Sequence, residues 1–161
     1  MIRKAGNKDC QSIAEIYNTY VEQGTSTMES KKTAKDIEKW ILNYKDREGL
    51  FVFEDKNKTV KGWGVIKKYS DRYGYRFACE TSIYVDSNAK RQRIGHQLNE
   101  FLIAKAKELD YKHMTAKIFA INTSSIHFFS KYGYTVVGQQ NKIGFLNNNW
   151  IDMVIMEKNI D

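Results

Sequence analysis

The sequence contains no proline, two cysteines and no long run of apolar residues. Two cysteines, Cys10 and Cys79, are too few for a disulfide framework, which excludes the small disulfide-rich secreted proteins. The N-terminal residues lack the apolar segment of a signal peptide, and no stretch has the length of a membrane span. We therefore expect a cytoplasmic protein with no membrane contact. No repeat, linker or low-complexity segment interrupts the chain, so we expect one domain over residues 1–161.

The composition is that of a folded basic protein. Hydrophobic residues make up 42% of the 161 residues and aromatic residues 13%, which is enough for a sizeable core. The formal net charge of +7 indicates an anionic partner. Nucleic acid, a membrane surface and a phosphorylated cofactor all satisfy that charge, and composition does not choose among them.

Hydrophobic periodicity predicts the element order β-α-α-β-β-β-α-β-α-β-β. Apolar residues at helical spacing predict helices over residues 8–21 and 33–44, and Thr33 with Asp36 forms a helix-start signal for the second helix. The other predicted helices are 94–109 and 122–132, and the predicted strands are 1–4, 50–54, 60–69, 75–85, 113–119, 135–145 and 150–158. The passage 75–119 is a strand-helix-strand unit, which predicts a right-handed parallel crossover. We expect a mixed α/β layered domain that ends in a hairpin.

A basic loop connects the predicted strand ending at Val85 to the following helix. Lys90, Arg91 and Arg93 lie in this loop. The first N–H groups of a helix lack intrahelical partners, and the helix dipole favours negative charge there. Ligands also bind at the carboxyl ends of strands in open α/β sheets. The loop therefore predicts a phosphate or pyrophosphate site; the alternative is an ordinary surface turn with solvated charges.

Several motifs together resemble the GNAT acetyltransferase superfamily over essentially the whole chain. The Gln/Arg-x-x-Gly-x-Gly/Ala signature falls on Lys90-Arg-Gln-Arg-Ile-Gly95, of which only the last glycine is kept. A second signature, Asn-x-x-Ser followed by a short helix and Gly-aromatic, falls on Asn122–Tyr134. Within the superfamily the chain looks like the phosphinothricin acetyltransferase group, in Arg72-Tyr-Gly-Tyr75, Glu80-Thr-Ser-Ile-Tyr-Val85, Gly144-Phe145 and Asn149-Trp-Ile-Asp152.

The resemblance implies a GNAT-like, mostly antiparallel sheet flanked by helices, with acetyl-CoA as donor and a primary amine as acceptor. The three histidines lack metal-ligand spacing, so we expect no metal. The backbone of Ile83, Tyr84 and Val85 would pair with the pantetheine arm, and an N–H near Val85 would polarise the thioester carbonyl. The implied pyrophosphate loop consists of Lys90, Arg91, Gln92, Arg93, Ile94, Gly95 and His96. Asn122 and Ser125 would contact the cofactor beyond the thioester. Arg93 stands where the family has glycine, which predicts a different backbone conformation or a direct contact of Arg93 with phosphate.

Glu80 is the candidate catalytic base. Acetyl transfer needs a neutral amine, and alkyl amines are mostly protonated at neutral pH, so a nearby carboxylate is useful. Strand alternation places Glu80 on the same face as Ser82 and Tyr84 and opposite Val85. The alternative is a salt-bridged surface carboxylate.

Arg72 and Tyr75 resemble the residues that hold the acceptor's carboxylate in the phosphinothricin group, with Glu80 beside them. Arginine forms planar bidentate pairs with carboxylates, which selects amino-acid-like acceptors. The alternative is an exposed basic turn without a role. The loop Thr25–Met28 is a candidate cover for the acceptor.

The proton donor for the leaving thiolate is not assigned. Phe129 stands where the family has tyrosine or histidine, and phenylalanine cannot donate a proton. Tyr132, His127, water and an unassisted thiolate remain as alternatives.

The leading functional prediction is therefore an N-acetyltransferase acting on an amino-acid-like amine of the phosphinothricin, methionine sulfoximine or methionine sulfone type. The alternatives are acetylation of a polyamine, an antibiotic or a protein N-terminus, and a non-catalytic acyl-CoA-binding module. A homodimer is expected from the family. No nucleic-acid-binding motif is present, so nucleic acid is not an expected partner.

Overall fold

The computed structural model describes residues 1–161 and contains the eleven predicted elements in the predicted order, joined by three short 3₁₀ turns. The strands are β1 (Ile2–Lys4), β2 (Gly49–Glu54), β3 (Val60–Lys68), β4 (Ala78–Val85), β5 (His113–Phe119), β6 (Thr135–Leu146) and β7 (Asn149–Asn159). The helices are α1 (Cys10–Gln23), α2 (Ala34–Asn43), α3 (Ile94–Glu108) and α4 (Thr123–Lys131).

All seven strands form one sheet in the order β1-β2-β3-β4-β5-β7-β6. Every neighbouring pair is antiparallel except β4 and β5, which α3 connects as a parallel crossover. The chain therefore has the expected mixed sheet with its parallel crossover and C-terminal hairpin, and these predictions are confirmed. None of the helices is both long and apolar enough to cross a bilayer.

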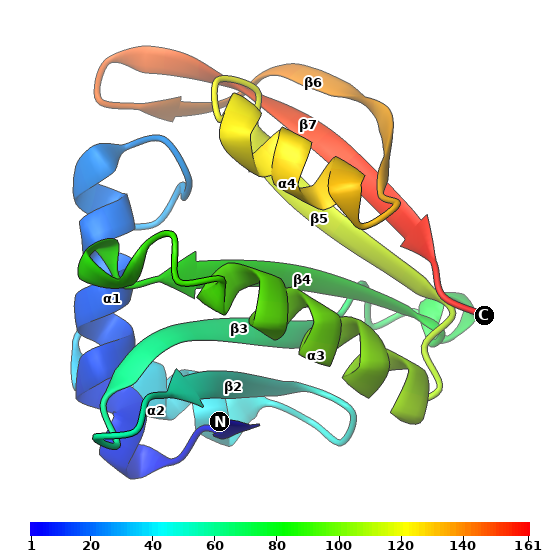
Figure 1. Cartoon of the computed structure of the whole chain (residues 1–161). Coiled ribbons are helices and arrows are strands. Elements are labelled where there is room, and N and C mark those ends of the chain that lie inside the picture. The colour runs from blue at the N-terminus through cyan, green and yellow to red at the C-terminus, as the bar shows by residue number, and fades with distance from the viewer.

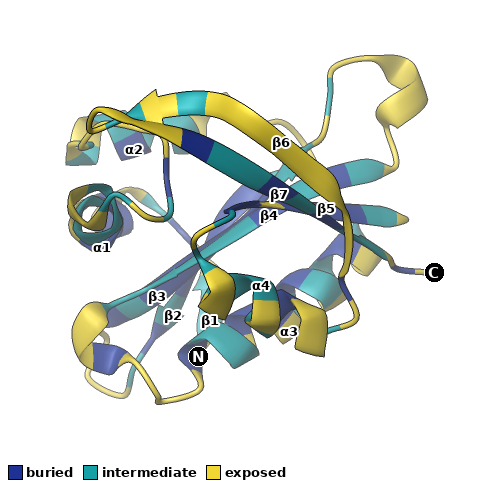
Figure 2. Ribbon diagram, turned by 90° about the horizontal axis from the view of Figure 1, so that it is seen from above, coloured by how far each residue is buried: buried dark blue, intermediate teal, exposed yellow.

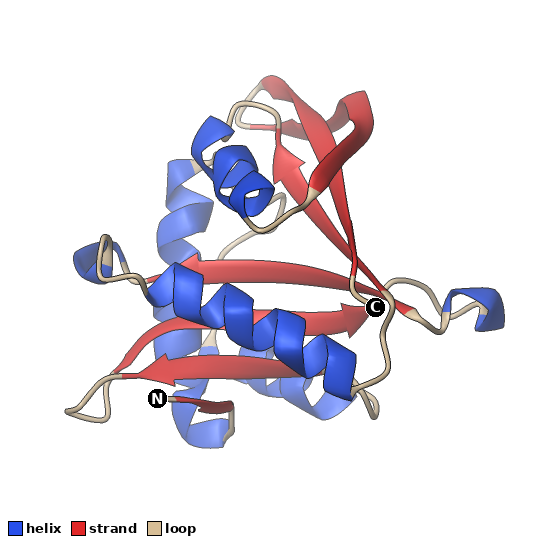
Figure 3. Ribbon diagram, turned by 45° about the vertical axis from the view of Figure 1, so that its right-hand side comes forward, coloured by secondary structure: helices blue, strands red, loops and turns tan.

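Helices cover both faces of the sheet (Figures 1 and 3): α3 and α4 lie on one face, and α1 and α2 on the other. Strand alternation divides the core accordingly. Ile66 and Cys79 belong to the buried cluster on the α3 and α4 side, whereas Trp63 and Val65 belong to the cluster on the α1 and α2 side. Most of β6 is exposed (Figure 2), because β6 is an edge strand beyond both helix layers.

Close approach of α3 to the sheet depends on a glycine in β3. A Cβ added at Gly64 would lie 2.7 Å from Leu102 Cδ1, and Leu102 is fully buried. The absence of a side chain at Gly64 thus lets α3 pack directly on β3 and fixes where the N-terminus of α3 lies relative to the end of β4.

The boundaries of α1 and α2 show how well local signals define helix ends. Thr33 and Asp36 form a capping box at the start of α2, as predicted. The start of α1 differs from the prediction, because Asn7–Asp9 form a 3₁₀ turn in which the Asp9 carboxylate accepts the Gly6 N–H. At its other end α1 continues through Gln23, to a left-handed Gly24.

The prediction of a strand from Tyr75 was wrong. Tyr73–Tyr75 form a 3₁₀ turn, and β4 begins only at Ala78. The turn closes on itself, because the N–H groups of Tyr75 and Arg76 donate to the carbonyls of Arg72 and Tyr73. The Arg76 guanidinium also stacks on the Tyr73 ring, with Cζ 4.1 Å from the ring centroid. These local contacts replace strand pairing.

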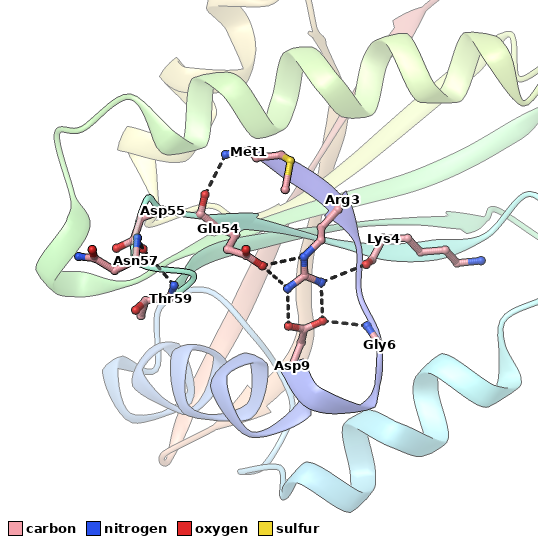
Figure 4. Close-up of polar contacts among 9 residues, drawn as sticks. All are labelled: Met1, Arg3, Lys4, Gly6, Asp9, Glu54, Asp55, Asn57 and Thr59. Atoms are coloured by element: carbon pink, nitrogen blue, oxygen red, sulfur yellow. Dashed lines mark hydrogen bonds and ion pairs between the residues drawn. The ribbon is translucent and has the colours of Figure 1, made fainter.

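A buried ion cluster fastens the N-terminus to the sheet (Figure 4). Arg3 on β1 forms a bidentate pair with Asp9, with N···O distances of 2.8 and 2.9 Å, and also binds Glu54 on β2. Asp9 is 3% exposed. Its pKa is lowered, chiefly by the hydrogen bonds from Arg3, against the opposing effect of burial.

Candidate active site

Strands β4 and β5 lie side by side only near their starts and then separate (Figure 1). Parallel pairing covers Ala78–Glu80 on β4 and His113–Thr115 on β5, and the rest of β5 pairs only with β7. The separation leaves a cleft of about 60 Å³. Its lining residues are Tyr20, Ser26, Thr81, Ser82, Ile83, Tyr84, Ala116, Lys117, Ile118, Phe119, Asn122, Ser125 and Phe129. Ile83, Tyr84, Asn122 and Ser125 are among the residues predicted to bind the cofactor.

The backbone of β4 presents alternate residues to the cleft. The Asp86 N–H donates to the carbonyl of Lys61 at the start of β3, and the Ala78 carbonyl accepts the N–H of Tyr69, so the backbone groups of even-numbered residues of β4 face β3. The odd-numbered residues, among them Ile83 and Val85, consequently face the cleft. A chain with amide groups entering the cleft can therefore pair with β4 as an additional strand.

Tyr20 of α1 hydrogen-bonds to the backbone of one of these two residues, Val85. Its hydroxyl donates to the Val85 carbonyl at 2.9 Å and accepts the Val85 N–H at 3.1 Å. Sequence periodicity identified Tyr20 only as a residue on the apolar face of a helix, and no local signal distinguishes this role. Since the Val85 N–H is engaged, Ile83 is the nearest residue in β4 whose N–H faces the cleft without this partner.

The basic loop lies where β4 leads into α3. Lys90, Arg91 and Arg93 are exposed, and Arg91 and Arg93 have positive φ values of 67° and 60°. Arg93 thus adopts the left-handed conformation that favours glycine, at the position that immediately precedes α3. Ile94 and Gly95 begin the helix, so their N–H groups lie at the N-terminal end of its dipole. The loop combines three exposed cations with the first N–H groups of a helix, which is a suitable site for an anion.

Two side chains near this loop connect α3 to α4. His96 Nδ1 and Tyr132 Oη are 2.8 Å apart, and Phe128 packs on the His96 ring. At the start of α4, Asn122 caps the helix by accepting the Ser125 N–H. The other end of the Asn122 amide donates to Ser26, so the loop between α1 and α2 is held against the cleft.

Glu80 lies at the point where β4 and β5 separate. Its carboxylate binds Lys67 Nζ of β3 and Lys117 Nζ of β5, each at 3.0 Å, and its side chain is 13% exposed. Burial by itself raises the pKa of Glu80, but the charge and hydrogen bonds of the two lysines outweigh burial and hold the pKa below its ordinary value. Glu80 is consequently an ionised, preorganised hydrogen-bond acceptor at the vertex of the cleft.

Phe129 lines the cleft and packs edge-on against Phe128 and Tyr134. The two other candidate proton donors, His127 on α4 and Tyr132 just after it, do not share this position. His127 is exposed, and the Tyr132 hydroxyl is engaged with His96 and Glu100. Neither residue lines the cleft, whereas Tyr20 does.

The structure does not bring Arg72 and Tyr75 together with Glu80 in one pocket. Arg72 lines a groove on the opposite side of its turn, with Arg47 and Tyr111. Tyr75 lines a different cavity of about 330 Å³, which reaches Thr115, the β5 residue paired with Glu80. Within a single chain, only Tyr75 approaches the vertex of the cleft.

A further cavity, which the sequence did not indicate, opens on the α1 and α2 side of the sheet. It measures about 240 Å³ and shares Ser82 and Tyr84 with the cleft. Five aromatic side chains line it, together with Glu29, Val65, Lys67 and Ser82; these are Tyr17, Trp40, Tyr44, Trp63 and Tyr84. The aromatic residues come from α1, the α2 region, β3 and β4, so only the packed structure assembles them.

The two cysteines are not placed to react as nucleophiles. Cys10 and Cys79 are both free and buried, and burial raises the pKa of the Cys79 thiol to about 12. The thiolate is the nucleophilic form, so neither residue provides covalent catalysis.

Comparison with known proteins identifies the family of the chain. The family model described as an acetyltransferase (GNAT) domain matches residues 2–155. An L-methionine sulfoximine/L-methionine sulfone acetyltransferase of Salmonella typhimurium is 28% identical over 163 residues, covering 99% of this chain and 94% of that protein.

Solved structures show the same fold. The crystal structure of an N-acetyltransferase from Staphylococcus aureus Mu50 has a TM-score of 0.94 and 29% identity, covering 100% of this chain and 98% of that one. A GNAT superfamily phosphinothricin acetyltransferase from Sinorhizobium meliloti, solved in complex with AcCoA, has a TM-score of 0.90 and 27% identity, covering 99% and 88%. The chain belongs to the GNAT family of acetyltransferases.

Proposed function

We propose that the protein is a cytoplasmic, single-domain N-acetyltransferase that uses acetyl-CoA to acetylate the primary amine of an amino-acid-like small molecule. The relatives named above as acetyltransferases of methionine sulfoximine, methionine sulfone and phosphinothricin support this acceptor class. The observation that carries the proposal is the cleft between β4 and β5, with Glu80 at its vertex and the cationic loop at its open end.

The residues of the cleft fit acetyl-CoA, which supplies an activated acetyl thioester. Ile83 offers backbone groups to the amides of the pantetheine arm, and its N–H is the donor that we assign to the thioester carbonyl. Lys90, Arg91 and Arg93, with the first N–H groups of α3, bind the pyrophosphate. Asn122 and Ser125 contact the cofactor from the other wall of the cleft.

Glu80 holds the amine and assists its deprotonation. A carboxylate that stays ionised accepts a hydrogen bond from the amine at neutral pH and orients its lone pair. Because the pKa of Glu80 is lowered, the proton passes on to water and does not remain on the carboxylate. The leaving thiolate has a modest pKa and can leave without a dedicated acid, which accords with Phe129 at that position.

The test is thiol release from acetyl-CoA, measured against methionine sulfone, phosphinothricin, polyamines and aminoglycosides. We expect turnover of the amino acid analogues, and a loss in kcat of about a hundredfold or more in Glu80→Gln. Glu108→Gln, which changes an exposed carboxylate on α3 that pairs with Lys105, is the matched control and keeps kcat within about tenfold. Turnover of polyamines or antibiotics alone would assign the acceptor to another class of amine.

We also propose a homodimer. Exposed apolar side chains gather on the sheet face that carries Glu80, where no helix covers β5 and β7; Tyr69, Tyr75 and Val137 line a cavity there with Ile155. A second copy packed on this face would cover these residues and remove their apolar surface from water.

A further inference from the structure

Lys67 contacts Glu80 and also lines the aromatic cavity. Its ammonium lies 3.0 Å from Glu80 Oε1, and its side chain also lines the aromatic cavity on the α1 and α2 side. The Lys67 side chain is 44% exposed, so the ammonium is not enclosed by the pair with Glu80. An ammonium has three donors, and the bond to Glu80 uses one of them.

None of the other charged side chains near the site offers a free cation to the aromatic cavity. Glu29, at the same cavity, is paired with Lys32. Lys117, the second partner of Glu80, lines the cofactor cleft and not the aromatic cavity. Arg72 lines a separate groove. Lys67 is therefore the one cation that lines the aromatic cavity.

We propose that Lys67 binds the carboxylate of the acceptor, while the side chain of the acceptor occupies the aromatic cavity. This inference rests on the proposed function and specifies its acceptor as an α-amino acid with an uncharged side chain. It differs from the sequence-based prediction, which assigned the carboxylate to Arg72 and Tyr75.

The connectivity of an α-amino acid supports this assignment. Its amine and its carboxylate are attached to the same carbon, so the protein groups that bind them must be neighbours. Glu80 and Lys67 are such neighbours, since they face each other across β3 and β4 and are joined by their ion pair. With the two charged groups held there, the remaining substituent of the same carbon is directed into the adjoining cavity.

The cavity walls favour an uncharged side chain. Aromatic rings provide polarisable apolar surface, which suits an uncharged side chain. The single carboxylate at the cavity is neutralised by Lys32, and Lys67 adds positive charge, so the binding of a cationic side chain is opposed.

The test compares methionine sulfone with its carboxamide, which keeps the amine and side chain but removes the negative charge. The enzymes are the wild type, Lys67→Met, and the matched variant Lys117→Met, which also removes one partner of Glu80. The quantity compared is the ratio of kcat/KM for the acid to kcat/KM for the amide. Both compounds carry the same amine, so an effect of the substitution on Glu80 changes both values and cancels in this ratio. We expect Lys67→Met to lower this ratio about ten- to a hundredfold, as the loss of a hydrogen bond to a charged group does.

We expect Lys117→Met and Arg72→Ala to leave the ratio within about threefold of the wild type, with the KM of the acid raised in Lys67→Met alone. An unchanged ratio in Lys67→Met, with turnover retained, would overturn the inference and leave the proposed function standing. A lower ratio in Arg72→Ala or Lys117→Met instead would assign the carboxylate to that residue. A wild-type enzyme that binds acetyl-CoA but turns over neither compound would overturn the proposed function and this inference with it.

Discussion

Arg93 occupies a backbone conformation that an arginine adopts at a cost. Its φ of 60° lies in the left-handed region, where a side chain costs about 1–2 kcal/mol relative to the right-handed region. The sequence predicted either a changed conformation or a direct phosphate contact at this position. The backbone keeps the conformation that glycine would favour, and the exposed guanidinium remains free for an anion.

Replacement of Arg93 by glycine separates these two effects. In Arg93→Gly we expect a free energy of unfolding within about 1 kcal/mol of the wild type, because relief of strain offsets the greater entropy of the unfolded chain. The affinity for acetyl-CoA falls because a cation is lost. Chemical denaturation and calorimetry measure the two quantities. Arg93→Lys is the control that keeps the charge; if it weakened binding as much as glycine does, charge would not be the cause.

The lowered pKa of Glu80 has a consequence for the pH dependence of the enzyme. A carboxyl whose pKa lies below its ordinary value is ionised throughout the range in which amines titrate. We therefore expect kcat/KM to rise with pH along the titration of the acceptor amine. Profiles measured with acceptors whose amines differ in pKa should shift accordingly, and a fixed inflection common to all acceptors would contradict this expectation.

At the scale of elements, the ion cluster of Arg3, Asp9 and Glu54 joins β1, the start of α1 and β2. Removal of the arginine leaves two carboxylates with little exposure and no cationic partner; Asp9 keeps only the hydrogen bond from the Gly6 N–H. For Arg3→Met we expect a loss on the order of 3 kcal/mol in the free energy of unfolding at neutral pH. The exposed pair of Lys31 and Glu22 is the control, and Lys31→Met should cost less than about 0.5 kcal/mol.

The same cluster predicts a pH dependence of stability. Asp9 has a folded-state pKa below its unfolded value, so its contribution is present above the unfolded pKa and is lost as pH falls through the folded pKa. The difference between wild type and Arg3→Met should therefore shrink as pH falls below about 4. Urea denaturation at a series of pH values measures this, and a difference that stays constant down to pH 2 would contradict it.

At the scale of the whole molecule, the uncovered sheet face predicts self-association. Val137 is 58% exposed and lines the apolar cavity of that face with Tyr69 and Tyr75. We expect Val137→Lys to shift the protein from dimer to monomer in sedimentation velocity, because a charge would be buried in the interface. Leu42→Lys changes an equally apolar residue, 73% exposed on α2, and should leave the dimer intact. A wild type that sediments as a monomer would exclude the dimer.

Much of the fold follows from local sequence patterns. Helical spacing and the Thr33 capping box defined α2, and alternating residues with turn signals defined the strands and the C-terminal hairpin. These features depend on interactions between residues close in the chain, so the sequence alone was sufficient. The strand wrongly extended to Tyr75 shows the limit, since a turn stabilised by Arg76 on Tyr73 has the same aromatic composition as a strand.

The sequence by itself determined the order of the elements, the basic loop between β4 and α3, and the position of Glu80 on its strand face. Only the tertiary structure decided that β4 and β5 separate after Glu80, that Tyr20 engages Val85, and that Lys67 joins Glu80 to the aromatic cavity. The physical reason is the distance along the chain. Tyr20 and Val85 are 65 residues apart, and no periodicity or turn signal records a contact that packing alone creates.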